Sequence, residues 1–282
     1  MIAILLALDL VVFAASSLRE AFIETAALFE REHAGAKVAL DFAGSQELRA
    51  QIESGAVADL FASADQWQLE TLARRGLVEK PVVFARNELV IVTPPDDPAG
   101  ISTLDDLPRA ARIVLGATAV PVGAYSERLL QAHGAAFRAQ VEARIVSREL
   151  NVRQVLTKVA LGEADAAIVY RTDALAGAGR VRTVAIPSAQ QPELAEYPIA
   201  VLRDAPHAAL ARAFVALVLS PRGRAILERR GFLAAAVADS AKARVAPSAA
   251  VPPRQPVVPH GAESAPPAKL PRAAPSATAH PP

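Results

Sequence analysis

Four positions along the chain could bind an anion without using a charged side chain. At each one an expected strand gives way to an expected helix, and the start of a helix offers unpaired backbone N–H groups and partial positive charge. Serine hydroxyls add further donors at two of the four. The positions are Ser17, Ser45 after Gly44, residues 121–123 (PVG) and residues 151–154 (NVRQ). Every helix needs an N-cap, so only the convergence of several starts on one crevice would make an anion site.

Local sequence supports these helix starts. Glu20 lies three residues after Ser17, which predicts a capping box. Gln154 has the same spacing from Asn151. Gly44 would let a ligand come close to the backbone, because it has no side chain. We therefore expect capped helices that begin at Ser17 and Asn151.

The hydrophobic pattern indicates the elements that must hold these positions. Short apolar runs alternate with amphipathic helical stretches, which is typical of an α/β fold with mostly parallel sheets. In such sheets, helix starts follow the carboxyl ends of strands, where ligands bind. Strands are expected at 10–14, 38–42, 60–62, 88–93, 112–115 and 166–170, and helices at 17–33, 45–54, 66–75, 124–134, 151–161, 209–219 and 222–230.

Composition argues against several other functions. The net charge of +1 comes without a basic stripe carrying aromatic residues, so we expect no nucleic-acid binding. The absence of cysteine excludes disulfides and thiolate sites, and no histidine spacing suits a metal. Ser45 lacks the second glycine of a nucleophile elbow. We therefore expect no enzyme and no catalytic residue. Trp67, the only tryptophan, is expected to pack within a helix.

The two ends of the chain differ in composition from the body. Residues 1–8 read either as a remnant of a secretion signal or as the start of a buried first strand, because a basic leader and a cleavage site are missing. Eleven of the 22 prolines fall in residues 246–282, among alanine and serine. Such a segment buries too little apolar surface to offset its ordering entropy, so a disordered tail is expected.

Seven motifs, in order, resemble the periplasmic molybdate-binding proteins of ABC transporters. The resemblance spans residues 10 to about 233, so it is specific. The motifs are residues 12–18 (VFAASSL), 42–45 (FAGS), 51–65 (QIESGAVADLFASAD), 121–125 (PVGAY), 151–153 (NVR), 168–170 (IVY) and 196–199 (EYPI).

The resemblance implies a two-lobed periplasmic-binding-protein fold of type II, in which each lobe is a mostly parallel sheet flanked by helices. Lobe I is expected to comprise residues 9–83 with 199–236 and lobe II residues 84–198. The chain would cross between them near 82–86 and 190–200, and these crossovers would act as hinges. The resemblance places the ligand contacts at Ser17, Ser45, Val122, Val152 and Tyr170. The two valines would contribute backbone N–H groups, and the other three residues hydroxyls.

The implied function is the substrate-binding component of a periplasmic transport system. The ligand would be molybdate or tungstate, with no cofactor and no bare metal ion, and the partner an ABC transporter permease. A monomer is expected. A pocket made only of donors suits a fully deprotonated oxyanion and disfavours phosphate, which carries a proton near neutral pH. A sulfate-type binding protein and an oxyanion-sensing effector domain remain as alternatives.

Overall fold

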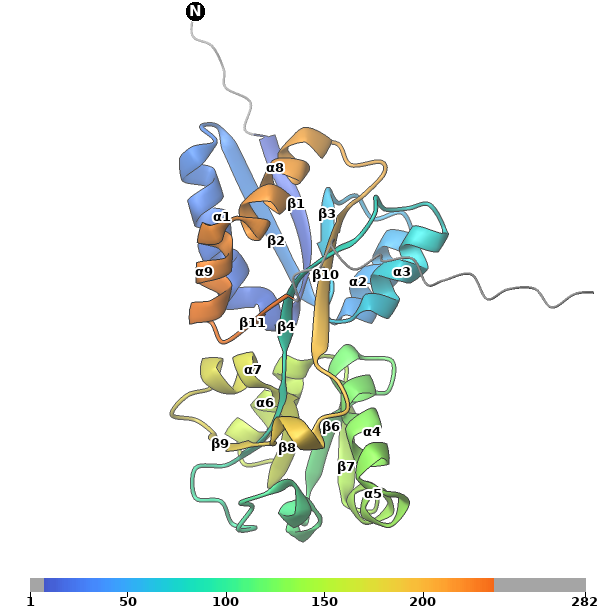
Figure 1. Cartoon of the computed structure of the whole chain (residues 1–282), viewed down its shortest axis with the longest axis vertical. Helices are drawn as coiled ribbons and strands as arrows, with labels where there is room; N and C mark the ends of the chain where they lie inside the picture. The colour runs from blue at the N-terminus through green and yellow to red at the C-terminus, as the bar shows by residue number, and fades with distance from the viewer. Residues whose placement is uncertain (1–7, 236–282) are drawn as a thin grey trace, which may run out of the picture. The chain divides into compact units, whose positions relative to one another are not determined.

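The computed structural model describes residues 8–235, which form two mixed β-sheets flanked by helices (Figure 1). The possible signal remnant, apart from Leu8, and the Pro-rich tail at 246–282 lie outside the described residues. The first sheet has the strand order β11-β4-β10-β3-β1-β2. Its strands are β1 (Leu8–Ala15), β2 (Ala36–Ala43), β3 (Leu60–Ala62), β4 (Val82–Asn87), β10 (Ala195–Val201) and β11 (Leu233–Ala234).

The second sheet has the strand order β7-β6-β8-β5-β9. Its strands are β5 (Leu89–Thr93), β6 (Ile113–Gly116), β7 (Ile145–Glu149), β8 (Ala166–Tyr170) and β9 (Arg182–Ala185). In each sheet most strands share one direction. β10 and β11 run against the other four strands of the first sheet, and β5 runs against the other four of the second. The predicted α/β fold of type II is confirmed.

We call the first sheet with its helices lobe I, and the second sheet with its helices lobe II. Lobe I carries the 3₁₀ turn η1 (Ser16–Leu18) and the helices α1 (Arg19–Glu32), α2 (Ser45–Glu53), α3 (Gln66–Arg74), α8 (Ala208–Leu219) and α9 (Pro221–Arg229). Lobe II carries η2 (Leu104–Arg109), α4 (Pro121–His133), α5 (Ala135–Glu142), α6 (Val152–Ala160), α7 (Arg171–Ala176) and η3 (Ser188–Gln190).

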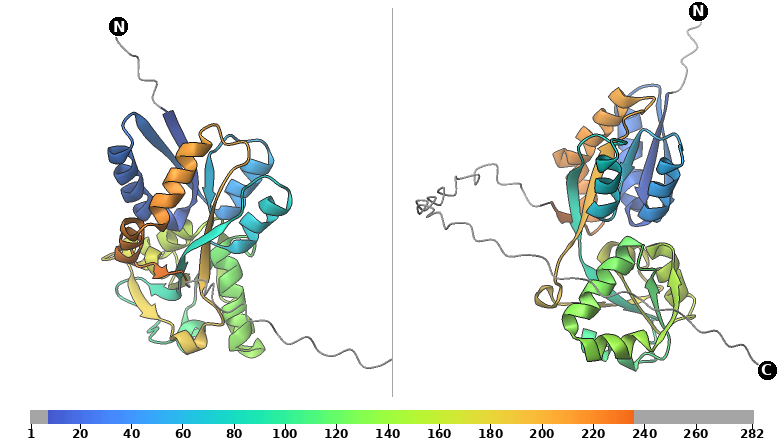
Figure 2. Two further views of the ribbon diagram at one scale, coloured as in Figure 1. Left: turned by 45° about the horizontal axis from the view of Figure 1, so that its top comes forward. Right: turned by 90° about the vertical axis from the view of Figure 1, so that its right-hand side faces the viewer.

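Burial separates central from edge strands. Every residue of β5 and β8 is buried, as expected for apolar runs inside a sheet covered on both faces. β2 forms one edge of the first sheet and alternates between more and less exposed residues. Helices α1, α8 and α9 contact one another, and α2 contacts α3, so the first sheet is enclosed by two helical groups (Figure 2).

The chain passes between the lobes along β4 and β10, which are antiparallel neighbours in the first sheet (Figure 1). The expected lobe boundaries fall inside these two strands, and they stay a prediction. β10 also contains Pro198, which has no N–H to donate to a sheet. The register shifts between Tyr197 and Pro198, a bulge that lets proline occupy a central strand.

The expected elements form with few differences. Helix α4 begins at Pro121 rather than at residue 124, because proline is well suited to the first helical position. The expected helix from Ser17 begins instead as the 3₁₀ turn η1. Helices α5 and α7 and strands β4, β7, β9, β10 and β11 were not expected. None of the helices within residues 8–235 is long and apolar enough to cross a membrane.

Candidate ligand-binding site

All five residues expected to contact a ligand line one small cavity. Ser17 and Ser45 reach it from lobe I, and Val122, Val152 and Tyr170 reach it from lobe II. The free space in the cavity is about 10 Å³, close to the room that one water molecule needs. None of its lining residues, all of them within residues 8–235, has a charged side chain. A guest larger than a water molecule would therefore fit only if the lining residues moved apart.

The cavity lies where five strands end. β1, β2, β6, β7 and β8 each lead within a few residues to one of the lining positions. Within each sheet these strands run parallel to one another, so their carboxyl ends gather at one edge. The expectation that helix starts converge on one crevice is thus met by the geometry.

Ser17 differs from its expected role as a helix cap. Its side chain makes no cap hydrogen bond, and the predicted capping box with Glu20 is wrong. Instead the Ser17 hydroxyl lies 2.9 Å from the hydroxyl of Tyr197 on β10. Glu20 accepts hydrogen bonds from Arg153 of lobe II. Both side chains therefore bond to residues far away in the sequence and do not form the local cap.

Ser45 is the first residue of α2, and Gly44 occupies the cap position without a side chain. The Ser45 oxygen accepts a hydrogen bond of 3.0 Å from the backbone N–H of Ala64. A Cβ atom on Gly44 would lie 2.5 Å from the backbone oxygen of Leu150 in lobe II. Gly44 therefore permits the approach of the opposite lobe.

Two helices of lobe II begin at residues that line the cavity. Helix α4 has Pro121 at its first position and no side-chain cap, so the N–H of Val122 has no partner from a cap. Helix α6 is capped by Asn151, as expected, whose side chain accepts from Arg153 N at 3.0 Å and Gln154 N at 3.1 Å. Those bonds use the second and third amides of the helix. The first amide, that of Val152, receives no hydrogen bond from the cap.

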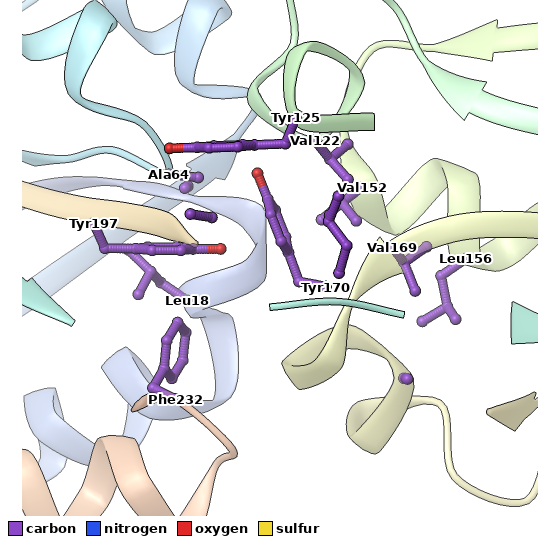
Figure 3. Packing of buried hydrophobic residues seen from close by; sticks show 14 of the residues in the cluster. Leu18, Ala64, Val122, Tyr125, Val152, Leu156, Val169, Tyr170, Tyr197 and Phe232 are labelled. Atoms are coloured by element: carbon purple, nitrogen blue, oxygen red, sulfur yellow. The ribbon is translucent and has the colours of Figure 1, made fainter. Parts of the chain in front are cut away.

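Tyr170 ends β8 with its side chain between the lobes (Figure 3). It is 1% exposed, and its hydroxyl has no hydrogen-bond partner within the described part of the chain. Burial raises the pKa of Tyr170 well above its usual value, so the phenol keeps its hydrogen and can donate it. A buried unpaired hydroxyl is costly, and a bound oxyanion would satisfy it.

Arg153, one of the cations next to the site in sequence, is already paired with carboxylates. Arg153 follows Val152, and its side chain contacts two carboxylates, Glu20 across the lobes and the fully buried Asp173. The Arg153 Nε and Asp173 Oδ1 atoms lie 2.6 Å apart, although without hydrogen-bond alignment. Burial raises the pKa of Asp173 to about 7, against the opposing charge of Arg153. The guanidinium therefore bridges carboxylates and does not line the cavity.

Three features escaped the sequence analysis. Tyr197 belongs to a motif of the resemblance but was given no role, and Asn87 carried no signal at all. Both are fully buried beside Ser17. Trp67 is 55% exposed, so its expected packing within a helix is wrong. It lies under the guanidinium of Arg49, 5.0 Å from ring centroid to Cζ, at the rim of an open cleft of about 820 Å³.

Comparison with known proteins first defines the class. Residues 10–233 match the family described as bacterial extracellular solute-binding protein. The chain superposes on the periplasmic molybdate-binding protein of Azotobacter vinelandii with a TM-score of 0.71 at 21% identity, over 80% of this chain and 99% of that one. It superposes on the sulfate-binding protein SubI of Mycobacterium tuberculosis with a TM-score of 0.74 at 19% identity, over 82% and 88%. These likenesses show the shared fold, and the fold alone does not select the ligand.

Sequence similarity is more specific. The molybdate-binding protein ModA of Mycobacterium tuberculosis is 41% identical over 226 residues, which cover 79% of this chain and 84% of that protein. The chain therefore belongs to the family of bacterial extracellular solute-binding proteins, and its resemblance to the molybdate-binding members is confirmed.

Proposed function

We propose that this protein is the molybdate-binding component of an ABC transporter, and that it holds the oxyanion with neutral donors from both lobes. One observation carries the proposal: the five expected contact residues, which are far apart in sequence, line a single uncharged cavity. The 41% identity to a protein named for molybdate binding supports the choice of ligand. Tungstate has the same charge and tetrahedral shape, so it is included.

The energetics of such a site are favourable without a countercharge. A hydrogen bond to a charged group contributes about 1.5–3 kcal/mol. Five of them would supply roughly 7–15 kcal/mol, against about 8 kcal/mol for micromolar affinity. Closure of the lobes uses part of this gain. The Ser17, Ser45 and Tyr170 hydroxyls and the Val122 and Val152 amides are the donors that we assign to the ligand.

The same proposal covers partners and location. Capture by lobe closure suits delivery to a membrane permease on the outer side of the cytoplasmic membrane, which accords with the family description. We propose a monomer that binds its ligand unchanged, with no cofactor, no nucleic acid and no catalytic step. The uncharged cavity offers neither an acid–base pair nor a nucleophile with a base beside it.

Calorimetric titration of the purified protein with molybdate, tungstate, sulfate and phosphate tests the proposal. We expect micromolar or tighter binding of molybdate and tungstate, much weaker binding of sulfate, and almost none of phosphate. Equal affinity for all four anions would refute the assignment of ligand. Ser45→Ala should weaken molybdate binding by at least about tenfold, because one charge-assisted bond is lost; an unchanged affinity would remove Ser45 from the site. Ser54→Ala, at the exposed end of α2, is the matched control.

A further inference from the structure

Ser17 is the first of three buried polar side chains linked by hydrogen bonds. The Ser17 hydroxyl lies 2.9 Å from the Tyr197 hydroxyl, and the Asn87 Nδ2 atom donates to the same Tyr197 oxygen at 3.3 Å. The side chains come from η1, β10 and β4, and their residues are at most 2% exposed. A chain this deeply buried has few alternative partners, so the direction of each hydrogen bond can be worked out.

The orientation of Asn87 sets that direction. The backbone N–H of Glu88, which can only donate, is bonded at 3.0 Å to the side-chain oxygen of Asn87. The NH₂ group of Asn87 must therefore face the other way, toward Thr172 Oγ1 at 2.9 Å and the Tyr197 hydroxyl. Both of those oxygens accept. This assignment does not depend on seeing hydrogens, because a backbone amide has no acceptor capacity.

The hydrogen bond between Ser17 and Tyr197 can run in either direction. In each case one of the two hydroxyl hydrogens is not used in that bond. If Ser17 donates to Tyr197, the spare hydrogen is on Tyr197, which does not line the cavity. If Tyr197 donates to Ser17, the spare hydrogen is on Ser17, which does line it. With an oxyanion bound, only the second direction gives every hydrogen an acceptor. An unmet buried donor is costly, so the second direction is favoured.

We propose that Asn87 and Tyr197 are positioning residues that fix the Ser17 hydroxyl as a hydrogen-bond donor to the ligand. The bonds run from Asn87 Nδ2 to Tyr197 Oη, from Tyr197 Oη to Ser17 Oγ, and from Ser17 Oγ to the anion. Successive bonds of one sense polarise each other, which strengthens the last one. Burial raises the pKa of Tyr197 well above its usual value, so its hydrogen is retained.

The second serine is held in the same sense by a different group. The Ser45 oxygen accepts from the backbone N–H of Ala64, which leaves its hydrogen for the cavity. Lobe I thus turns two rotatable hydroxyls, each able to donate or accept, into fixed donors. A hydroxyl held in this way points its hydrogen toward the anion, so it favours an anion oxygen that accepts over one that carries a hydrogen. The arrangement therefore selects for fully deprotonated oxyanions, a property that rests on the proposed function.

A double-mutant cycle tests whether Tyr197 acts through Ser17. Molybdate affinity is measured by calorimetry for the wild type, Tyr197→Phe, Ser17→Ala and the double variant. Tyr197→Phe keeps the ring, which packs against Phe84, Tyr170 and Phe232, and removes only the hydroxyl. We expect it to weaken binding about tenfold in the wild-type background and less than about twofold in the Ser17→Ala background. Equal losses in the two backgrounds would overturn the proposal.

Two further variants protect this interpretation. Tyr125→Phe removes the hydroxyl of a nearby buried tyrosine that accepts from Glu196 N instead, so its effect should be the same in both backgrounds. Asn87→Asp replaces the donor by an acceptor of the same shape, which draws the Tyr197 hydrogen away from Ser17. Its loss should exceed that of Tyr197→Phe and should shrink in the Ser17→Ala background. If the affinity loss caused by Asn87→Asp is as large in the Ser17→Ala background, Asn87 does not act through Ser17. This test holds even if Tyr197→Phe fails to fold.

The outcomes separate this inference from the proposed function. If the wild type binds molybdate but the effects of Tyr197→Phe and Ser17→Ala are additive, only the positioning role of Asn87 and Tyr197 is overturned. If the wild type binds none of the four oxyanions, the proposed function is overturned, and the positioning role of Asn87 and Tyr197 is overturned with it.

Discussion

The two lobes present the same kind of group, a hydrogen-bond donor, in two different forms. Lobe I offers the hydroxyls of Ser17 and Ser45. The Ser45 oxygen accepts from the Ala64 amide, and the Ser17 oxygen lies 2.9 Å from the Tyr197 hydroxyl. Lobe II offers the Tyr170 hydroxyl and the backbone amides of Val122 and Val152, and the amides need no such support because the helix fixes their direction. A hydroxyl rotates and an amide does not. The difference explains why the buried polar network of Asn87, Tyr197 and Ser17 lies on the lobe I side.

The lobes also differ in how they meet. Lobe I brings Gly44, Gln46 and Glu20 to the junction, and lobe II brings the Leu150 carbonyl and the Arg153 guanidinium. Gln46 Nε2 donates to Leu150 O at 2.8 Å, beside the position of Gly44. Apart from Gly44, which lines the cavity, the residues that make these contacts lie outside its lining.

The largest loss of molybdate affinity should come from a substitution that keeps Gly44 of lobe I away from Leu150 of lobe II. Gly44→Ala places a Cβ atom 2.5 Å from the Leu150 oxygen, so the lobes cannot close fully. The donors of lobe II are then held away from the anion, and we expect molybdate affinity to fall about 100-fold or more in calorimetry. The backbone of Gly44, at φ −65° and ψ 139°, accommodates alanine, so the ligand-free protein should unfold at nearly the wild-type temperature.

Gly177→Ala is the control for that variant. Its Cβ would meet only side-chain atoms of Leu156 and Val181, at 3.2 Å, at the end of α7. We expect wild-type affinity. If Gly44→Ala also binds like the wild type, close contact between the lobes is not needed for capture.

Tyr170→Phe should separate binding from stability. The variant loses one bond to the anion, so affinity should fall about 10- to 100-fold. It also removes a buried hydroxyl that has no partner among residues 8–235, so the ligand-free protein should gain about 1 kcal/mol. Chemical denaturation with and without molybdate measures both changes. A loss of stability without ligand would show that the hydroxyl has a structural partner, contrary to this account.

Asn151→Ala should act on the fold more than on the ligand. The Asn151 side chain caps two amides of α6 and leaves that of Val152 free, so its removal should cost about 1 kcal/mol of stability. Affinity should fall only a few-fold, because the Val152 amide stays in place. Asn151→Ser, which can still cap, should recover most of the stability. An affinity loss as large as that of Ser45→Ala would mean that the asparagine itself binds the anion.

The last prediction concerns the pH dependence of stability, away from the ligand. Burial raises the pKa of Asp173 to about 7, whereas an aspartate in the unfolded chain titrates near about 4. Between these values the folded protein binds more protons than the unfolded chain, so the contribution of Asp173 to stability falls as pH rises. The free energy of unfolding of the wild type minus that of Asp173→Asn should therefore decrease from pH 4 to pH 7. An increase would mean that Arg153 keeps the carboxylate ionised.

The sequence was informative where a single local rule decides the structure. The start of α6 follows from Asn151 and the apolar spacing after it, and central strands such as β5 and β8 follow from unbroken apolar runs. The resemblance then supplied Tyr170, which no local pattern marks. Gly134, with φ 116°, ended the expected helix correctly but gave no sign that α5 begins at the next residue.

The remainder depends on contacts between residues far apart in the chain. The capping box at Ser17 looked favourable locally, but Tyr197, 180 residues away, binds the hydroxyl instead. Asp173 resembles an ordinary exposed acid near a helix start, and only the fold buries it against Arg153. The shift of register at Pro198, which sets the place of Tyr197, also requires the neighbouring strand β4.

A crystal structure of the protein with molybdate tests the central claim most directly. We expect the anion in the cavity between the lobes, with its oxygens accepting from the Ser17, Ser45 and Tyr170 hydroxyls and from the Val122 and Val152 amides. The Arg153 guanidinium should remain with Glu20 and Asp173. An anion bound away from these five groups, or paired directly with a lysine or arginine, would contradict the account.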